Sequence, residues 1–302
     1  MKVKRFIYIL HPGKANYPEI AAYTSYFQDA YDVYSGTVED YERFDKKSEC
    51  ILWCIMGLYR KPLEAKFVIH DYRSLSVGAM PWLKDAVKKY LNVKPDLRIF
   101  QNQEMKNVMA FSDGITSILL PMGVPDYIYD IKPHSDVQFH QKFCYIGEMS
   151  RERGFDKVLD AYVKNYSEDK LVLIGTPEEY IFEKYSNFSQ LMFLGRKPQE
   201  ETLSIVKACE YAVCYFPYHR PHKFQAPTKL LEYMAMGCRV VCNDSPSNIR
   251  EINRFSYDCI LTKSKVFTDV SPFLDSRSEV LSVEGLGWDE AIRGSMLELY
   301  LL

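Results

Sequence analysis

The sequence predicts an α/β protein that contains two doubly wound parallel sheets facing a cleft. Residues 138–262 alternate short apolar runs with amphipathic segments, and residues 5–121 do so less regularly. Strands that are separated by one helix each indicate a parallel sheet with right-handed crossovers. The chain has 302 residues, which is enough for two such halves.

The first half is predicted to hold five strands and three helices. The strands are the apolar runs at 5–10, 50–56, 66–71, 98–102 and 115–121. The helices are the segments at 17–30, 80–91 and 103–111. The stretch 121–136 contains three prolines and several charges, so we expect it to link the halves.

The second half is predicted to alternate more strictly. Its strands are expected at 142–147, 170–175, 191–195, 212–217, 238–243 and 257–261. Its helices are expected at 154–166, 177–186, 199–211, 227–236 and 246–253. We therefore expect a first domain at 1–130, a second at 138–285 and a final helical segment at 286–302.

Composition excludes several classes of protein. Apolar residues make up 47% and charged residues 26%, which is typical of a globular enzyme. The net charge of −2 provides no general attraction for nucleic acid. No apolar run is long enough to cross a bilayer, and the eight cysteines form no C-x-x-C pair. We expect a cytoplasmic protein with free thiols and no bound metal.

Ligands of doubly wound sheets bind beyond the carboxyl ends of the strands, so the strand-to-helix turns are the informative positions. They lie at Gly13, at His70 and Asp71, and at 147–154, 175–176, 195–197 and 217–228. Neither a G-x-G-x-x-G turn after a strand nor a Walker A sequence is present.

The predicted helix 227–236 raises a question of its own. Its apolar residues share one side, and Pro227 suits the first helical position. Lys229 and Glu232 fall on the opposite side, three residues apart. They form either an exposed ion pair or part of a ligand site, because a helix N-terminus suits a diphosphate.

Four segments in order, "YIGEMSRERGFDKVLDAY", "LVLIG", "FLGRKPQEETLSIVKACEYAVCYFP" and "PTKLLEYMAMGCRVV", carry a resemblance to a known family. They resemble the nucleotide-sugar half of retaining glycosyltransferases of the family 4 type, whose GT-B fold has two Rossmann-like domains. "LPMGV" at 120–124 and "GWDEAIRGSMLELY" at 287–300 resemble the segment that closes the first domain and the final helix that returns to it.

The resemblance is strong over 138–255 and weak over 1–120. It implies transfer of a sugar from a nucleotide-diphosphate sugar to a glycan or lipid-linked acceptor, in polysaccharide or glycoconjugate synthesis. It also implies retention of anomeric configuration without a metal or other cofactor. No D-x-D motif is present.

The resemblance assigns roles to residues of the second domain. It places Glu232 on the ribose. Thr228 and Lys229 stand at the N-terminus of the same helix, from where Lys229 could reach the phosphates, and we expect both to bind the nucleotide. The resemblance places Arg153 on the diphosphate. It also places Gly195 and Arg196 at the base.

In the first domain the resemblance places His70 and Asp71 near the donor sugar and the acceptor. The first turn of that domain contains Gly13, which would allow close approach of the backbone to a ligand.

Two residues depart from the family pattern. Glu148 stands where an arginine is usual, and Phe224 stands where the first glutamate of an E-x7-E pair is usual. Two other functions therefore stay open. One is a non-catalytic GT-B protein that binds a nucleotide sugar or glycan. The other is a nucleotide-sugar epimerase, although residues 217–227 contain no carboxylate for work at the sugar ring.

The segment "LKDAVKKYL" at 83–91 of the first half is basic and places three lysines among apolar residues. A basic amphipathic helix either covers a sheet or lies in a membrane interface. If the acceptor is lipid-linked, we expect the first domain to dock peripherally on the inner face of the membrane through this helix, helped by the basic N-terminus.

Overall fold

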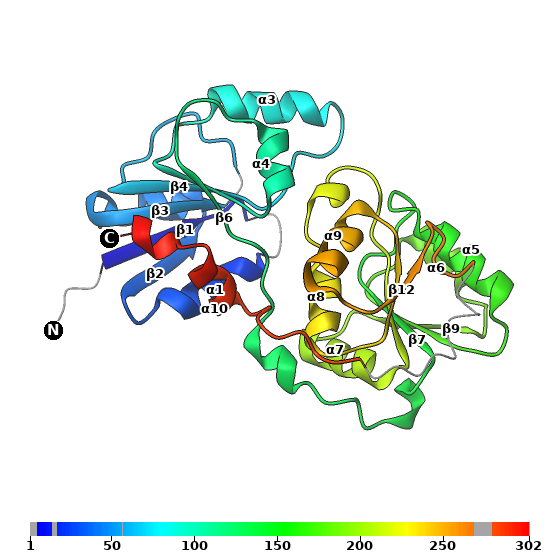
Figure 1. The fold of residues 1–302 in the computed structure, drawn as a ribbon. Helices are drawn as coiled ribbons and strands as arrows, with labels where there is room; N and C mark the ends of the chain where they lie inside the picture. Colours follow the sequence, from blue (N-terminus) through cyan, green and yellow to red (C-terminus); the bar gives the residue numbers. More distant parts are fainter. Residues whose placement is uncertain (1–4, 14–16, 56, 269–279, 302) are drawn as a thin grey trace. The chain divides into compact units, whose positions relative to one another are not determined.

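A computed structural model describes residues 5–13, 17–55, 57–268 and 280–301. Lys2 and Lys4 of the basic N-terminus lie outside the described residues. The chain divides into two compact units (Figure 1). Unit 1 contains Met1–Gly123, Phe224–Ala226 and Gly287–Leu302, and unit 2 contains Val124–Lys223 and Pro227–Leu286.

Unit 1 is built on a six-stranded sheet with the order β2-β1-β3-β4-β5-β6, in which all paired strands are parallel. The strands are β1 (Arg5–Leu10), β2 (Tyr31–Gly36), β3 (Cys50–Ile55), β4 (Phe67–Tyr72), β5 (Leu97–Phe100) and β6 (Ser117–Leu119). The α-helices are α1 (Pro18–Phe27), α2 (Val38–Glu42), α3 (Pro81–Leu91), α4 (Gln103–Met109) and α10 (Trp288–Gly294). They cover both faces of the sheet (Figure 1).

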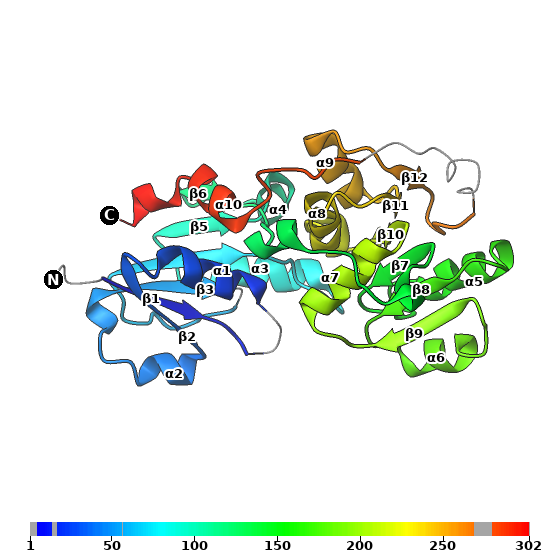
Figure 2. The same ribbon diagram turned by 90° about the horizontal axis from the view of Figure 1, so that it is seen from below.

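Unit 2 has a second six-stranded parallel sheet, with the order β12-β11-β10-β7-β8-β9 (Figure 2). Its strands are β7 (Phe143–Ile146), β8 (Leu171–Ile174), β9 (Leu191–Gly195), β10 (Tyr211–Cys214), β11 (Val240–Asn243) and β12 (Ile260–Thr262). Its α-helices are α5 (Phe155–Asn165), α6 (Glu179–Tyr185), α7 (Gln199–Ala208), α8 (Thr228–Ala235) and α9 (Pro246–Phe255).

Short 3-10 helices complete the described elements. They are η1 (Lys47–Glu49), η2 (Asp126–Asp130), η3 (Val137–Phe139), η4 (His222–Phe224) and η6 (Leu297–Tyr300). The helix η2 lies in the predicted linker and contacts α8 within unit 2.

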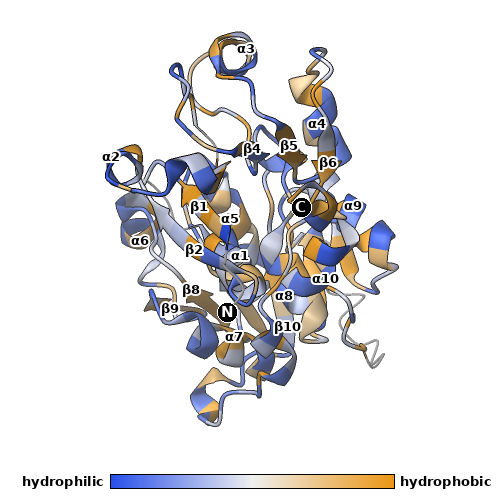
Figure 3. Ribbon diagram, turned by 90° about the vertical axis from the view of Figure 1, so that its left-hand side faces the viewer, coloured by the Kyte–Doolittle hydropathy of each residue, from blue (hydrophilic) through white to orange (hydrophobic). Residues whose placement is uncertain are grey.

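The predicted α/β class with two parallel sheets is confirmed. The buried strands follow the apolar runs of the sequence, and β1, β8 and β10 are coloured largely as hydrophobic in Figure 3. No helix among the described residues is long and apolar enough to cross a bilayer.

Three local predictions are wrong. The edge strand β2 and the short helix α2 were not expected, because "YDVYSG" has no continuous apolar run. The final helix is interrupted, since Met296 has φ of +55° and separates α10 from η6. Pro227 is the N-cap of α8 and not its first helical residue.

The carboxyl end of β4 carries a buried polar cluster within unit 1. Asp71 is 1% exposed, and its carboxylate accepts hydrogen bonds from Tyr23 Oη at 2.8 Å and Trp53 Nε1 at 3.0 Å. Arg73 Nε lies 2.8 Å from Asp71 Oδ1, and Arg73 Nη1 donates to the carbonyl oxygen of Leu120 at 2.7 Å. The cluster joins α1, β3, β4 and the segment after β6.

Removal of the carboxylate from this cluster is expected to destabilise the protein strongly. The substitution Asp71→Ala leaves the guanidinium of Arg73 buried without its counter-ion, which typically costs about 3–5 kcal/mol. Urea unfolding measures this loss, and Asp29→Ala, at an exposed position of the same unit, serves as the control. A loss below about 1 kcal/mol for Asp71→Ala would contradict the structural role of the pair.

Candidate functional site

Three adjacent strands of unit 2 each run into a glycine at their carboxyl end. Gly147 follows β7, Gly175 follows β8, and Gly195 ends β9, with φ values of +126°, +135° and +68°. The N–H of Gly147 donates to the carbonyl oxygen of Ile174 at 2.8 Å, and the N–H of Gly175 donates to that of Gly195 at 2.8 Å. These bonds continue the ladder past the strands, so the three turns lie close together.

A side chain at two of these turns would meet neighbouring atoms, and at position 175 these atoms belong to the backbone. A Cβ atom on Gly175 would collide with the carbonyl oxygen of Gly147. A Cβ atom on Gly147 would collide with Nζ of Lys229 and lie 2.8 Å from its Cε. The missing side chain at position 147 therefore leaves the space that Lys229, from the first turn of α8, occupies.

The three turns and the N-terminal part of α8 surround a cavity of about 600 Å³. Its lining comes from the ends of β7, β8 and β9, from α7 and from α8. The polar side chains among the lining residues are those of Glu148, Thr176, Arg196, Lys197, Gln199, Thr202, Lys229 and Glu232. The cavity thus lies where ligands of doubly wound sheets bind.

Lys229 is half-buried at the edge of this cavity. Its Nζ lies 3.4 Å from Oη of Tyr145 and 4.6 Å from the centre of that ring, within the range of a cation–π contact. Burial lowers the pKa of Lys229 to about 8, and the nearby charge of Arg153 acts in the same direction. The cavity therefore contains an ammonium group that forms no ion pair with a residue in the described part of the chain.

Glu232 lies one turn further along α8 and is also half-buried. Its Oε1 accepts a hydrogen bond from Nε2 of Gln199 at 2.9 Å. Burial raises the pKa of Glu232 to about 7. The interpretation of Lys229 and Glu232 as an exposed ion pair is wrong, because both are half-buried and line the cavity.

The loop after β7 contains the arginine that the resemblance places on a diphosphate. Nε of Arg153 lies 3.0 Å from Oε2 of Glu148, which in turn lines the cavity. The carbonyl oxygen of Arg153 accepts a hydrogen bond from Tyr215 Oη at 2.6 Å, and this bond fixes the loop against β10. The guanidinium of Arg151 instead lies 4.3 Å from the centre of the Tyr180 ring.

The predicted residues of unit 2 fall into two groups. Arg196, Lys229 and Glu232 line the cavity together. Gly195, Thr228 and Arg153 lie next to lining residues in the sequence or contact them. The assigned roles of all six stay predictions.

The predicted residues of unit 1 have other surroundings. His70 is 4% exposed between the rings of Tyr59 and Tyr72, and burial lowers its pKa to about 4. Asp71 belongs to the buried cluster with Arg73, which fits a structural role. Gly13 has φ of +70° and its N–H donates to His11 Nδ1 at 3.2 Å. The catalytic role of His70 and Asp71 and the binding role of Gly13 stay predictions.

Phe224 occupies the position of the missing glutamate and belongs to unit 1. Its side chain packs against a buried apolar cluster, and its carbonyl oxygen accepts a hydrogen bond from Asn102 Nδ2 at 2.7 Å. The cluster consists of Tyr72, Leu75, Phe100, Met105 and Met109. A glutamate side chain would be unfavourable against these residues because it would bury a charge.

The prediction missed Gln199 as the partner of Glu232, and Gly147 as the residue that makes room for Lys229. The sequence did contain a signal for the role of Gly147, because a glycine follows or ends each of the apolar runs of β7, β8 and β9. Across the described residues, no group of three or more His, Cys, Asp or Glu side chains could hold a metal ion.

The sequence of unit 2 is similar to one known protein family. Residues 133–266 match the family model of glycosyl transferases group 1. A search of curated proteins gives no match.

Solved structures resemble the whole chain at low sequence identity. Anabaena HepE in complex with UDP and glucose has a TM-score of 0.71 at 10% identity, with 99% of this chain and 100% of HepE covered. Sucrose-phosphate synthase from Thermosynechococcus elongatus has a TM-score of 0.69 at 13% identity, with 99% of each chain covered.

AviGT4, a glycosyltransferase involved in avilamycin A biosynthesis, has a TM-score of 0.64 at 13% identity, with 98% of this chain and 97% of AviGT4 covered. At these identities the likeness concerns the fold. The chain therefore has the GT-B fold, and its residues 133–266 are similar to glycosyl transferases group 1.

Proposed function

We propose that this protein is a glycosyltransferase that moves a hexosyl group from a nucleotide-diphosphate sugar to a glycan or lipid-linked acceptor, with retention of anomeric configuration and without a metal. The observation that carries the proposal is the pair of half-buried residues Lys229 and Glu232 beside the glycine turns of β7, β8 and β9. An ammonium group and a carboxylate one helical turn apart match the phosphates and the ribose of one nucleotide.

The proposed roles follow from the chemistry of each group. Ionised Glu232 accepts hydrogen bonds from the ribose hydroxyls, in place of the one that Gln199 donates in the free protein. Lys229 and the N-terminus of α8 attract the diphosphate. Arg153 adds charge beside the same group. Stabilisation of the departing diphosphate would supply most of the rate enhancement, as electrostatic catalysis requires.

Uridine nucleotides are the first ligands to test. The comparison structure of HepE contains UDP and glucose. The family model and the GT-B neighbours support a sugar transferase over other enzymes with parallel sheets. A role in polysaccharide or glycoconjugate synthesis is part of the proposal.

A non-catalytic nucleotide-sugar or glycan-binding protein is the second candidate, and two observations favour it. Glu148 pairs with Arg153 and so reduces the positive charge beside the proposed diphosphate. The usual first glutamate is replaced by Phe224, which packs in unit 1. Slow hydrolysis of UDP-glucose without an acceptor would favour the enzyme, and tight binding without any turnover would favour the second candidate.

Peripheral contact with a membrane through α3 is a further part of the proposal. The contact would bring the enzyme to a lipid-linked acceptor. The exposed side chains of Trp82, Leu83, Tyr90 and Leu91 on that helix support it.

The substitution Glu232→Ala is expected to lower affinity for UDP-glucose and leave the fold intact. A lost hydrogen bond to a charged group costs about 1.5–3 kcal/mol, which corresponds to roughly 10- to 150-fold in the dissociation constant. Isothermal titration calorimetry measures this change. Glu183→Ala, at an exposed position of α6, removes a glutamate from unit 2 without touching the cavity and should bind normally.

The affinity of the wild-type protein for UDP-glucose should depend on pH. Glu232 loses its negative charge as the pH falls through about 7, and Lys229 loses its positive charge as the pH rises through about 8. Affinity should therefore be highest between these values and fall on both sides. Unchanged affinity in Glu232→Ala would return this residue to a structural role.

The substitution Arg153→Ala should weaken binding of UDP about tenfold or more and leave binding of uridine nearly unchanged. The reason is that its guanidinium is proposed to act on the diphosphate alone. Arg151→Ala is the matched control, because it removes the same charge from the same loop while its side chain lies on Tyr180. Equal losses for UDP and uridine in Arg153→Ala would rule out the contact.

A further inference from the structure

The helix α3 of unit 1 buries charged side chains and exposes apolar ones, which is unusual for a helix that covers a sheet. Asp85 is 8% exposed and Lys88 is half-buried. In contrast, Trp82, Tyr90 and Leu91 are 67%, 75% and 55% exposed. A surface helix normally turns its apolar stripe inward, so α3 leaves apolar side chains exposed that a partner could cover.

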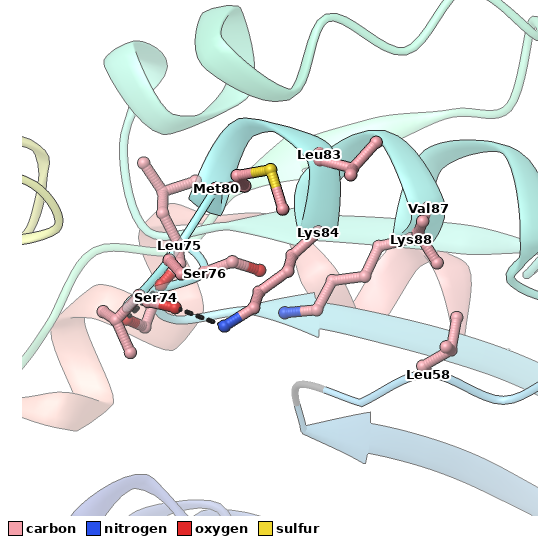
Figure 4. A pocket seen from close by; sticks show the side chains of 11 residues that line it. Leu58, Ser74, Leu75, Ser76, Met80, Leu83, Lys84, Val87 and Lys88 are labelled. Carbon is pink, nitrogen blue, oxygen red and sulfur yellow. Dashed lines mark hydrogen bonds between the residues drawn. The ribbon is translucent and has the colours of Figure 1, made fainter.

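The inner side of α3 is tied to the segment that follows β4. Oδ1 of Asp85 accepts a hydrogen bond from the backbone N–H of Ser76 at 3.1 Å. Nζ of Lys84 donates to the carbonyl oxygen of Val77 at 2.8 Å. These two bonds hold the segment against the N-terminal half of α3, and together they form walls of a pocket of about 680 Å³ (Figure 4).

The pocket combines apolar walls with two positive charges. Leu58, Met80, Leu83 and Val87 contribute much of the apolar lining. Lys84 and Lys88 lie four residues apart on α3, and both side chains extend into the pocket in Figure 4. Besides the two lysines, the residues with polar side chains that line the pocket are Ser74 and Ser76.

Asp85 lies between the two lysines on α3, but its Oδ1 accepts a hydrogen bond from the N–H of Ser76, and no described carboxylate lines the pocket. Neither forms an ion pair with any residue in the described part of the chain. Like charges at i and i+4 repel each other, and burial together with Lys84 lowers the pKa of Lys88. A doubly charged anion between the two ammonium groups would relieve this repulsion. Carboxylates of sugars carry one charge, whereas a phosphate monoester carries up to two.

We propose that this α3 pocket binds a phosphate-bearing lipid, with the phosphate at Lys84 and Lys88 and the hydrocarbon chain along Leu58, Leu83 and Val87. The inference rests on the proposed function in one respect, because the bound lipid would be the lipid-linked acceptor. The lipid would enter past Val77, Met80 and Leu83, whose exposed apolar side chains line the pocket. A free glycan is disfavoured, since the walls offer few hydrogen-bonding groups for its hydroxyls.

Binding of a short-chain probe to the full chain tests this proposal. Decyl phosphate, kept below its micelle concentration, should bind at least tenfold more tightly than inorganic phosphate and than decyltrimethylammonium in calorimetry. Lys88→Met, which keeps the length of the side chain but removes its charge, should weaken binding of decyl phosphate at least tenfold. Lys88→Arg should retain most of the affinity.

Lys89→Met is the matched control, because it removes an adjacent lysine of α3 that does not line the pocket and should change affinity less than twofold. The midpoint of urea unfolding of each variant, compared with that of the wild-type protein, reports that the protein is folded. The proposal is overturned if inorganic phosphate or decyltrimethylammonium binds as tightly as decyl phosphate, or if Lys88→Met and Lys89→Met lose affinity equally. If the wild-type protein binds decyl phosphate but not UDP, the proposed function fails and the lipid site stands.

Discussion

The side chain of Lys229 occupies space that exists only because residue 147 has no Cβ atom. A Cβ atom on Gly175 would collide with the carbonyl oxygen of Gly147, so the ends of β7 and β8 can lie this close together only with glycine at position 175. Both glycine turns and the N-terminal part of α8 line the cavity. Lys229 and Glu232 are half-buried there, and burial moves the pKa of each toward neutrality.

The corresponding edge of the first sheet uses polar residues for a different purpose. Asp71 and Arg73 at the end of β4 are buried, paired with each other and bonded to α1, β3 and the segment after β6. Strand-end polar residues thus stabilise the fold of unit 1, whereas those of unit 2 line an open cavity. Position at a strand end does not distinguish the two cases, because the difference arises from what packs against each side chain.

Much of the fold could be predicted from the sequence, because buried parallel strands appear as continuous apolar runs between amphipathic helices. β2 could not be predicted in this way, since an edge strand that is partly exposed has no such run. Helical periodicity identified the side of α8 that carries Lys229 and Glu232. It could not reveal that neighbouring turns and Gln199 cover this side, because those contacts come from residues 30 or more positions away. The apolar residues of α3 suggested a buried apolar side, but the helix buries Asp85 and exposes Trp82, Tyr90 and Leu91.

If the cavity beside α8 holds a nucleotide diphosphate, a crystal structure of the protein with UDP will show it there. We expect the ribose hydroxyls to replace Gln199 as the partner of Glu232, and the diphosphate to lie at the N-terminus of α8 within hydrogen-bonding distance of Lys229. UDP bound elsewhere, with the bond between Gln199 and Glu232 intact, would contradict this expectation.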